Sequence, residues 1–261
     1  MDASALRYWD LWLILLLLAT VVPWRGYQRV KKLLALDVIS SADRMTIYGS
    51  TILFQWLLAG VAFWRARAHD ISLKQLGLAM PSPVPLAGLL AIAAALSLVL
   101  LAVQARSMRT LARLPVEKQG RMGVFLRKLM PPAAAGAAER TLFAGVALTA
   151  GICEEFLFRG FAITALTSLL LLAPIPAGLL PWWGGTSFQA LAWASALLAS
   201  AIFGASHAYQ GVAGALSTFV VGLVFSLVYL ATGSLFPTVA AHAAVDFVGG
   251  IWTHRVLARG G

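Results

Sequence analysis

Six ionisable side chains stand inside the apolar second half of this 261-residue chain, and they are the residues that could carry chemistry. From Gly160 to His254 there is no Lys, Arg or Glu, and one Asp is the only formally charged residue. An ionisable side chain at bilayer depth costs at least ~2.5–3.5 kcal/mol, so each is a candidate functional residue. The six are Glu154, Glu155, Arg159, His207, His242 and Asp246.

Two adjacent glutamates are predicted to have different roles. On a helix, Glu155 and Arg159 stand at i and i+4 with the Glu first, which is the orientation that favours an ion pair. Glu154 lies about 100° around the helix from Glu155, so its side chain points away from the face that carries the Glu155–Arg159 pair. The spacing therefore predicts a structural pair, Glu155 with Arg159, and a second carboxylate, Glu154, that can act as a general base.

The histidines complete a set of groups that can activate water. His242 and Asp246 repeat the i, i+4 spacing, and His207 closes another apolar segment four residues after Phe203. Two histidines with carboxylates can activate water directly, or they can bind a metal ion that does so. The single cysteine, Cys153, excludes an intramolecular disulfide and is expected to serve packing.

Three short motifs resemble the CPBP intramembrane proteases, the family that includes the type II CAAX prenyl endopeptidases and the bacterial Abi proteins. The chain reads EEFLFR at Glu154–Arg159, FGASH at Phe203–His207 and HAAVD at His242–Asp246, in the family's order. The resemblance covers roughly Thr141 to Trp252. In the first 140 residues, only the amphipathic stretch Ile71–Leu78 is similar to a segment of relatives.

The resemblance implies a role for each matching residue. Glu154 with His207 would activate a water for attack on a peptide carbonyl, while Glu155, Arg159 and Phe203 would support the site. The implied activity is that of an intramembrane endopeptidase that matures or sorts membrane-anchored protein substrates.

Position 246 departs from the prenyl endopeptidases, which have Asn there. The resemblance implies that His242 and the residue at position 246 stabilise the oxyanion, but an ionised Asp cannot donate a hydrogen bond to it. Asp246 is therefore expected to orient His242, to bind a metal or to work protonated. Because the chain lacks the H-E-x-x-H arrangement of zinc proteases, we favour a glutamate-type enzyme without a cofactor. If zinc were bound instead, its ligands would be His207, His242, Glu154 and Asp246.

The composition predicts an integral membrane protein with an all-α, polytopic transmembrane bundle of about eight spans, within a range of six to eight. Of its residues 60% are hydrophobic and 11% charged, whereas about a quarter are charged in soluble domains. The fifth expected span is short and contains Pro174 and Pro176. The expected spans are Tyr8–Trp24, Met45–Trp64, Val84–Ala105, Thr141–Leu166, Thr167–Leu180, Phe188–His207, Val212–Ala231 and Leu235–Trp252.

The net charge of +10 is not predicted to serve nucleic-acid binding, because the basic residues are distributed over loops. Those in the loops after the first and third spans are expected on the cytoplasmic side, where they also favour anionic lipid. Basic residues are expected in the loops after the first three spans, with the N-terminus outside. The segment Arg106–Lys128 suits either a helix on the membrane surface or a solvated irregular loop. The expected loop residues are Arg25, Arg29, Lys31, Lys32, Arg44, Arg65, Arg67, Lys74, Arg106, Arg109, Arg113, Lys118, Arg121, Arg127, Lys128 and Arg140.

We expect residues 1–140 to form N-terminal spans with basic cytoplasmic loops, and residues 141–261 to form the catalytic core. A bacterial inner membrane is the expected location. One alternative is a proton-coupled transporter, because buried Glu, His and Asp also form proton relays. Another is a catalytically idle immunity or chaperone protein on the same scaffold. No pair of interrupted helices in the two halves supports the transporter.

Overall fold

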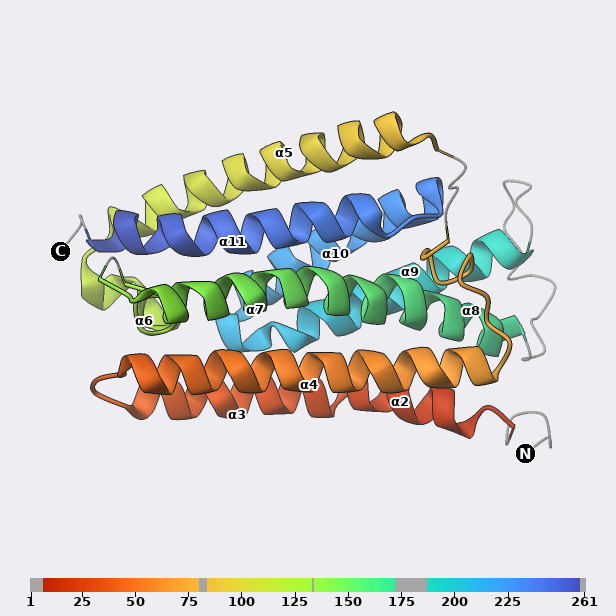
Figure 1. Cartoon of the computed structure of the whole chain (residues 1–261), viewed down its shortest axis with the longest axis horizontal. Helices are drawn as coiled ribbons and strands as arrows, with labels where there is room; N and C mark the ends of the chain where they lie inside the picture. Colours follow the sequence, from red (N-terminus) through yellow and green to blue (C-terminus); the bar gives the residue numbers. More distant parts are fainter. Residues whose placement is uncertain (1–6, 80–83, 133, 172–186, 259–261) are drawn as a thin grey trace. The chain divides into compact units, whose positions relative to one another are not determined.

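The computed structural model describes residues 7–79, 84–132, 134–171 and 187–258, and in these ranges every regular element is helical (Figure 1). The all-α prediction is confirmed. The helices are α2 (Trp9–Ala19), α3 (Val21–Ala35), α4 (Ser41–Ala68), α5 (Leu86–Ala112), α6 (Gly120–Leu129), α7 (Ala137–Glu155), α8 (Thr164–Leu171), α9 (Ser187–Ser206), α10 (Val212–Thr232) and α11 (Phe236–Ala258). Two 3₁₀ turns, η1 (Val116–Lys118) and η4 (Ala208–Gln210), and a π-helix, η2 (Phe156–Ile163), join them.

In the described part of the chain, six helical stretches are long and apolar enough to cross a membrane, which confirms a multi-pass membrane protein. A helix suits that environment because it satisfies its own backbone hydrogen bonds. The six are Trp9–Ala35, Ser41–Ala68, Leu86–Ala112, Ala137–Leu171, Gln189–Ser206 and Val212–Thr232.

Two of the eight expected spans are not among these six. The described part of the fifth, Thr167–Leu171, continues the helical stretch that begins at Ala137, and the remainder up to Leu180 lies outside the described residues. The eighth is the helix α11, but His242 and Asp246 lower its hydropathy below that of the other spans. The six candidate spans of the described residues lie within the predicted range of six to eight.

The first helical stretch runs well beyond the expected end at Trp24. The helix α2 stops at Ala19 because Pro23, in the first turn of α3, has no N–H and its ring clashes with the carbonyl four residues earlier. The chain resumes as a helix at Val21 and continues to Ala35. The basic residues expected in the first loop therefore lie mostly on α3, which corrects the prediction.

The other basic residues also lie largely on helices. The helix α5 extends to Ala112, and η1 and α6 follow it, so the segment Arg106–Lys128 is mostly helical. Of the two alternatives for this segment, the structure favours a helix over an irregular loop. The location of the segment on a membrane surface stays a prediction. Arg65 and Arg67 lie in the last turn of α4.

The chain folds into two compact units that alternate along the sequence. The first unit consists of Met1–Arg25, Leu58–Pro85 and Glu155–Leu235, and the second consists of Gly26–Leu57, Leu86–Glu154 and Phe236–Gly261. One of the points where the chain passes from one unit to the other falls between Glu154 and Glu155. The predicted division of the chain at residue 140 stays a prediction.

The first unit is built on the pair α9 and α10, with η2, α8 and α2 packed against α9. Small residues allow the two helices of this pair to approach closely, as is common in membranes. A Cβ on Gly204 of α9 would lie 2.8 Å from the carbonyl oxygen of Ala215 and 2.9 Å from Phe219 Cβ, both on α10. The close approach brings Phe203 and Phe225 into the core of the unit.

The second unit has α5 and α11 side by side as its main helix pair, drawn in yellow and blue in Figure 1. A second close approach joins α7 to α11, because a Cβ on Gly151 would lie 2.8 Å from Ala243 Cβ and 2.9 Å from the carbonyl oxygen of Val239. Glu154 follows Gly151 by three residues, on the same side of α7. This contact therefore sets Glu154 beside α11.

Candidate active site

In the second unit, three predicted site residues come together between α7 and α11. His242 Nε2 lies 4.0 Å from Glu154 Oε2 and 3.6 Å from Asp246 Oδ2. The exposed fractions of the three side chains are 18% for Glu154, 12% for His242 and 42% for Asp246. The imidazole thus faces two carboxylates, of which the Glu154 carboxylate is mostly shielded from solvent and the Asp246 carboxylate is open.

A fourth residue, Gln55 of α4, belongs to this cluster and was missed by the sequence analysis. Its amide Nε2 donates a hydrogen bond of 2.6 Å to Glu154 Oε1. The sequence contains a feature that could have identified this residue: Gln55 is the only amide or charged side chain between Thr51 and Arg65. A lone polar side chain in a membrane helix is commonly used for hydrogen bonding to a neighbouring helix. We refer to Gln55, Glu154, His242 and Asp246 as the glutamate cluster.

In the first unit, the predicted ion pair between Glu155 and Arg159 is confirmed. Arg159 Nη1 donates to Glu155 Oε1 at 2.9 Å, and the side chains are 1% and 0% exposed. The guanidinium also lies over the rings of Phe203, 4.2 Å from the ring centre, and Phe225, at 5.4 Å. Because ring faces attract cations, Phe203 supports Arg159 directly.

The ion pair lies at the start of a π-helix where a continuous α-helix was expected. The segment η2 covers Phe156–Ile163, and all eight of its residues are buried. Its i→i+5 hydrogen bonds widen the turn, and such segments are frequent at functional sites. The wider turn occurs where Gly160 meets the backbone of the Ile71–Leu78 stretch: a Cβ on Gly160 would lie 2.8 Å from the carbonyl oxygen of Leu76.

Two backbone carbonyls fix the Ile71–Leu78 stretch to the rest of the first unit. The hydroxyl groups of Thr164 and Tyr229 both donate to the carbonyl oxygen of Gln75, at 2.9 and 2.6 Å. The amide N–H of Leu235 donates to the carbonyl oxygen of Gly77. The segment is therefore an integral part of the packing around η2.

His207 is held by the backbone of its own helix. Its Nδ1 lies 2.9 Å from the carbonyl oxygen of Phe203, and its ring centre is 4.8 Å from the ring centre of Phe203. Because a carbonyl oxygen only accepts, Nδ1 must be the donor, and the neutral ring carries its lone pair on Nε2. His207 therefore presents a basic nitrogen at Nε2.

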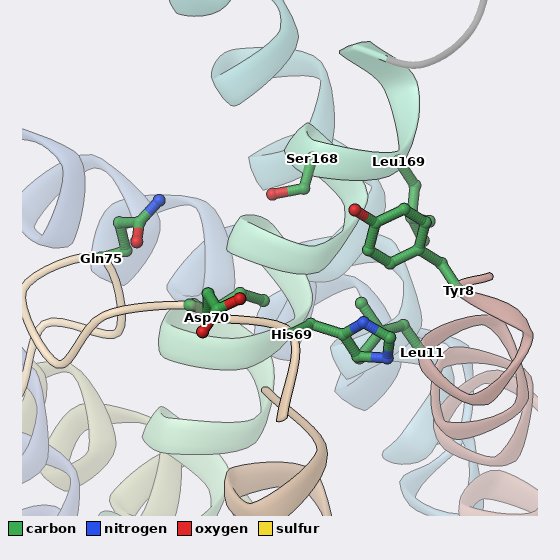
Figure 2. Close-up of a pocket in the computed structure, with 8 residues that line it drawn as sticks. Tyr8, Leu11, His69, Asp70, Gln75, Ser168 and Leu169 are labelled. Atoms are coloured by element: carbon green, nitrogen blue, oxygen red, sulfur yellow. The ribbon is translucent and has the colours of Figure 1, made fainter. Parts of the chain in front are cut away.

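A pocket of about 140 Å³ occupies another part of the first unit (Figure 2). None of the predicted site residues lines it. The ring of Tyr8 lies against the ring of His69, with 4.8 Å between their centres, and His69 Nε2 lies 2.9 Å from both carboxylate oxygens of Asp10. Arg65 Nε donates to Asp10 at 2.5 Å. These contacts join the start of α2 to the end of α4, so we interpret the region as a structural anchor. The lining residues are Tyr8, Leu11, His69, Asp70, Ile71, Gln75, Ser168 and Leu169.

The helices and the two sets of polar contacts define a multi-pass membrane protein that keeps acid–base groups within its helical core. Residues 137–248 match the family model described as Rce1-like, type II CAAX prenyl endopeptidase. This segment contains all three motifs, so over these residues the chain is similar to the predicted CAAX-protease family. No curated protein and no solved structure was found to match the chain.

Proposed function

We propose that this protein is an intramembrane endopeptidase of the glutamate type, which hydrolyses a peptide bond near the membrane interface. The observation that carries the proposal is the glutamate cluster. A mostly shielded carboxylate, Glu154, accepts a hydrogen bond from Gln55 on one oxygen and faces His242 with the other. A general base needs this kind of fixed orientation towards the proton that it removes.

The proposed reaction is a balanced hydrolysis. Glu154 takes a proton from a water molecule as the water oxygen attacks the peptide carbonyl carbon, and a tetrahedral oxyanion forms. The proton then passes to the leaving nitrogen as the C–N bond breaks. One peptide bond and one water become a carboxylic acid and an amine, and Glu154 returns to its starting state.

His242 is proposed to stabilise the oxyanion, with Asp246 acting through it. The distance of 3.6 Å from Asp246 Oδ2 to His242 Nε2 is too long for a hydrogen bond but allows a charge interaction. An imidazole N–H can donate a hydrogen bond to the oxyanion, whereas an ionised carboxylate cannot. The resemblance of the FGASH motif gives His207 a further part in the proton transfers, through the basic Nε2 described above.

Zinc is the alternative source of activated water. Among the residues that the structure describes, no three His, Cys, Asp or Glu side chains are grouped as ligands of one metal ion. The proposed reaction therefore needs no metal ion, and chelation tests the alternative.

The proposed substrates are membrane-anchored proteins or peptides, which the enzyme would mature or sort in a bacterial inner membrane. This proposal is supported by the family match and by the six candidate spans, because a site among membrane helices favours substrates that share the bilayer.

The test compares the ends of membrane proteins in bacterial cells that express the wild type or the Glu154→Gln variant. Wild-type cells should contain new protein termini that are absent with Glu154→Gln, because the amide preserves the shape but cannot take a proton. Glu117→Gln is the matched control, since Glu117 is an exposed carboxylate on η1. Identical termini with wild type and Glu154→Gln would reject the peptidase and leave the transporter or the idle scaffold.

A further inference from the structure

The Gln55 side chain makes one strong hydrogen bond and leaves its other polar atom without one. Its Nε2 donates to Glu154 Oε1, while its carbonyl oxygen, Oε1, is buried and has no hydrogen-bond partner among the described residues. A buried acceptor without a partner costs about 1–3 kcal/mol, and such groups in folded proteins call for an explanation. One explanation is a ligand or water that the site holds during its reaction.

The orientation of the amide follows from its partner. A carboxylate only accepts hydrogen bonds, so the NH₂ end of Gln55 must face Glu154. The nitrogen and oxygen of an amide are about 2.2 Å apart, from the standard bond lengths. With the hydrogen bond of 2.6 Å, Gln55 Oε1 therefore lies at most about 4.8 Å from Glu154 Oε1.

A single water can bridge this separation. Two hydrogen bonds of about 2.8 Å span up to about 5.6 Å, and a water has two hydrogens to donate. A carboxylate oxygen has more than one acceptor site, so Glu154 Oε1 can accept from Gln55 and from the water together. His242 Nε2 lies 4.0 Å from the other carboxylate oxygen, Glu154 Oε2.

We propose that Gln55 is a positioning residue for the hydrolytic water: its amide fixes the Glu154 carboxylate, and its carbonyl oxygen accepts the water's second hydrogen. The water would then have one hydrogen directed at the base and one at Gln55, and its lone pairs directed away from both towards the substrate carbonyl. This proposal deepens the proposed function and depends on it.

The rival role for Gln55 is that of a simple link between helices, and the chain offers a matched control for it. Trp56, the next residue of α4, donates from Nε1 to Thr149 Oγ1 of α7 at 3.2 Å. This bond joins the same two helices but does not touch Glu154. Thr149→Val removes it with little change in shape, whereas Gln55→Met removes the bond to Glu154.

The experiment measures kcat, KM and unfolding for Gln55→Met, Thr149→Val and Glu154→Gln, on a substrate found in the comparison of protein termini. We expect Gln55→Met to lower kcat by on the order of 10–100-fold, with KM within about threefold, because a misplaced reacting group costs rate more than binding. Thr149→Val should keep kcat within about threefold. Wild-type kcat in Gln55→Met, or an equal fall in both variants, would overturn the proposal.

A second measurement needs no activity. The infrared carboxylate band of Glu154 is the band that Glu154→Gln removes, and its frequency should shift in Gln55→Met and not in Thr149→Val. An unshifted band in Gln55→Met would refute the proposed contact. If Glu154→Gln remains active, the proposed function fails; if Glu154→Gln is inactive but Gln55→Met has wild-type kcat, only the inference about Gln55 fails.

Discussion

Replacing Glu155 by Gln should destabilise this protein severely, although the change is nearly isosteric. The Glu155 and Arg159 side chains are 0% and 1% exposed, so the substitution leaves a guanidinium deep in the first unit without the Glu155 carboxylate. Removing one partner of a buried ion pair costs about 3–5 kcal/mol. At 1.4 kcal/mol for each factor of ten, the folding equilibrium constant should fall by roughly two to four orders of magnitude.

The aromatic rings around the guanidinium do not replace the carboxylate. Arg159 keeps its contacts with Phe203 and Phe225, but a cation–π contact contributes about 0.5–2 kcal/mol. Both proteins make these contacts, so they do not enter the difference in stability between the variant and the wild type. The destabilisation should therefore remain large.

Unfolding of the detergent-solubilised protein measures the effect, with Glu154→Gln as the comparison. Glu154 is the preceding residue, and the exposed fraction of its side chain is 18%, so its amide variant should unfold within about 1 kcal/mol of the wild type. The double variant Glu155→Gln/Arg159→Met removes both charges and should recover much of the stability, since an apolar replacement for a buried pair is often neutral. Wild-type stability in Glu155→Gln, or no recovery in the double variant, would refute the reasoning.

Two further predictions concern metal content and helix packing. Proteolysis should survive prolonged treatment with EDTA or phenanthroline, and the purified protein should carry less than one zinc per chain; stoichiometric zinc that is lost with activity and restores it on re-addition would establish the metalloprotease instead. Gly160→Ala should destabilise the protein by about 1–3 kcal/mol because its Cβ meets the Leu76 backbone, whereas Gly49→Ala, with nothing within 4 Å, should be neutral or slightly stabilising. Equal unfolding midpoints for the two alanine variants would contradict the packing of η2.

The parts of the site that lie within one helix could be predicted from the sequence. The pairs Glu155–Arg159 and His242–Asp246 are both four residues apart, and helical geometry alone brings such residues to one face. Gln55 and Glu154 are 99 residues apart, so their contact depends on how α4 packs against α7. A search of the apolar stretches for lone polar residues would have selected Gln55 as a candidate, but not its partner.

The helical class and the membrane spans were predicted more reliably than the helix ends. Hydropathy marks where a helix is apolar, but α3 continues beyond Trp24 through basic residues that keep good helix propensity. Arg29, expected in a loop, lies on α3 and donates to Thr51 Oγ1 of α4 at 2.7 Å. Such a bond between helices compensates a polar side chain for leaving water, and no pattern local to α3 indicates it.

The π-helix η2 has a consequence for the pattern of mutational tolerance along this stretch. In α7, tolerance of polar substitutions should recur every three to four residues, as expected for a helix with one buried face. From Phe156 to Ile163 all eight positions are buried, so the periodicity should disappear and every position should be sensitive. Beyond Thr164 the periodicity of three to four residues should return. The tolerant positions should be offset from those expected for an unbroken α-helix, because the wider turns of η2 change the direction in which the following side chains point. A helical wheel drawn through Ala137–Leu171 would therefore assign the side chains after Glu155 to the wrong faces.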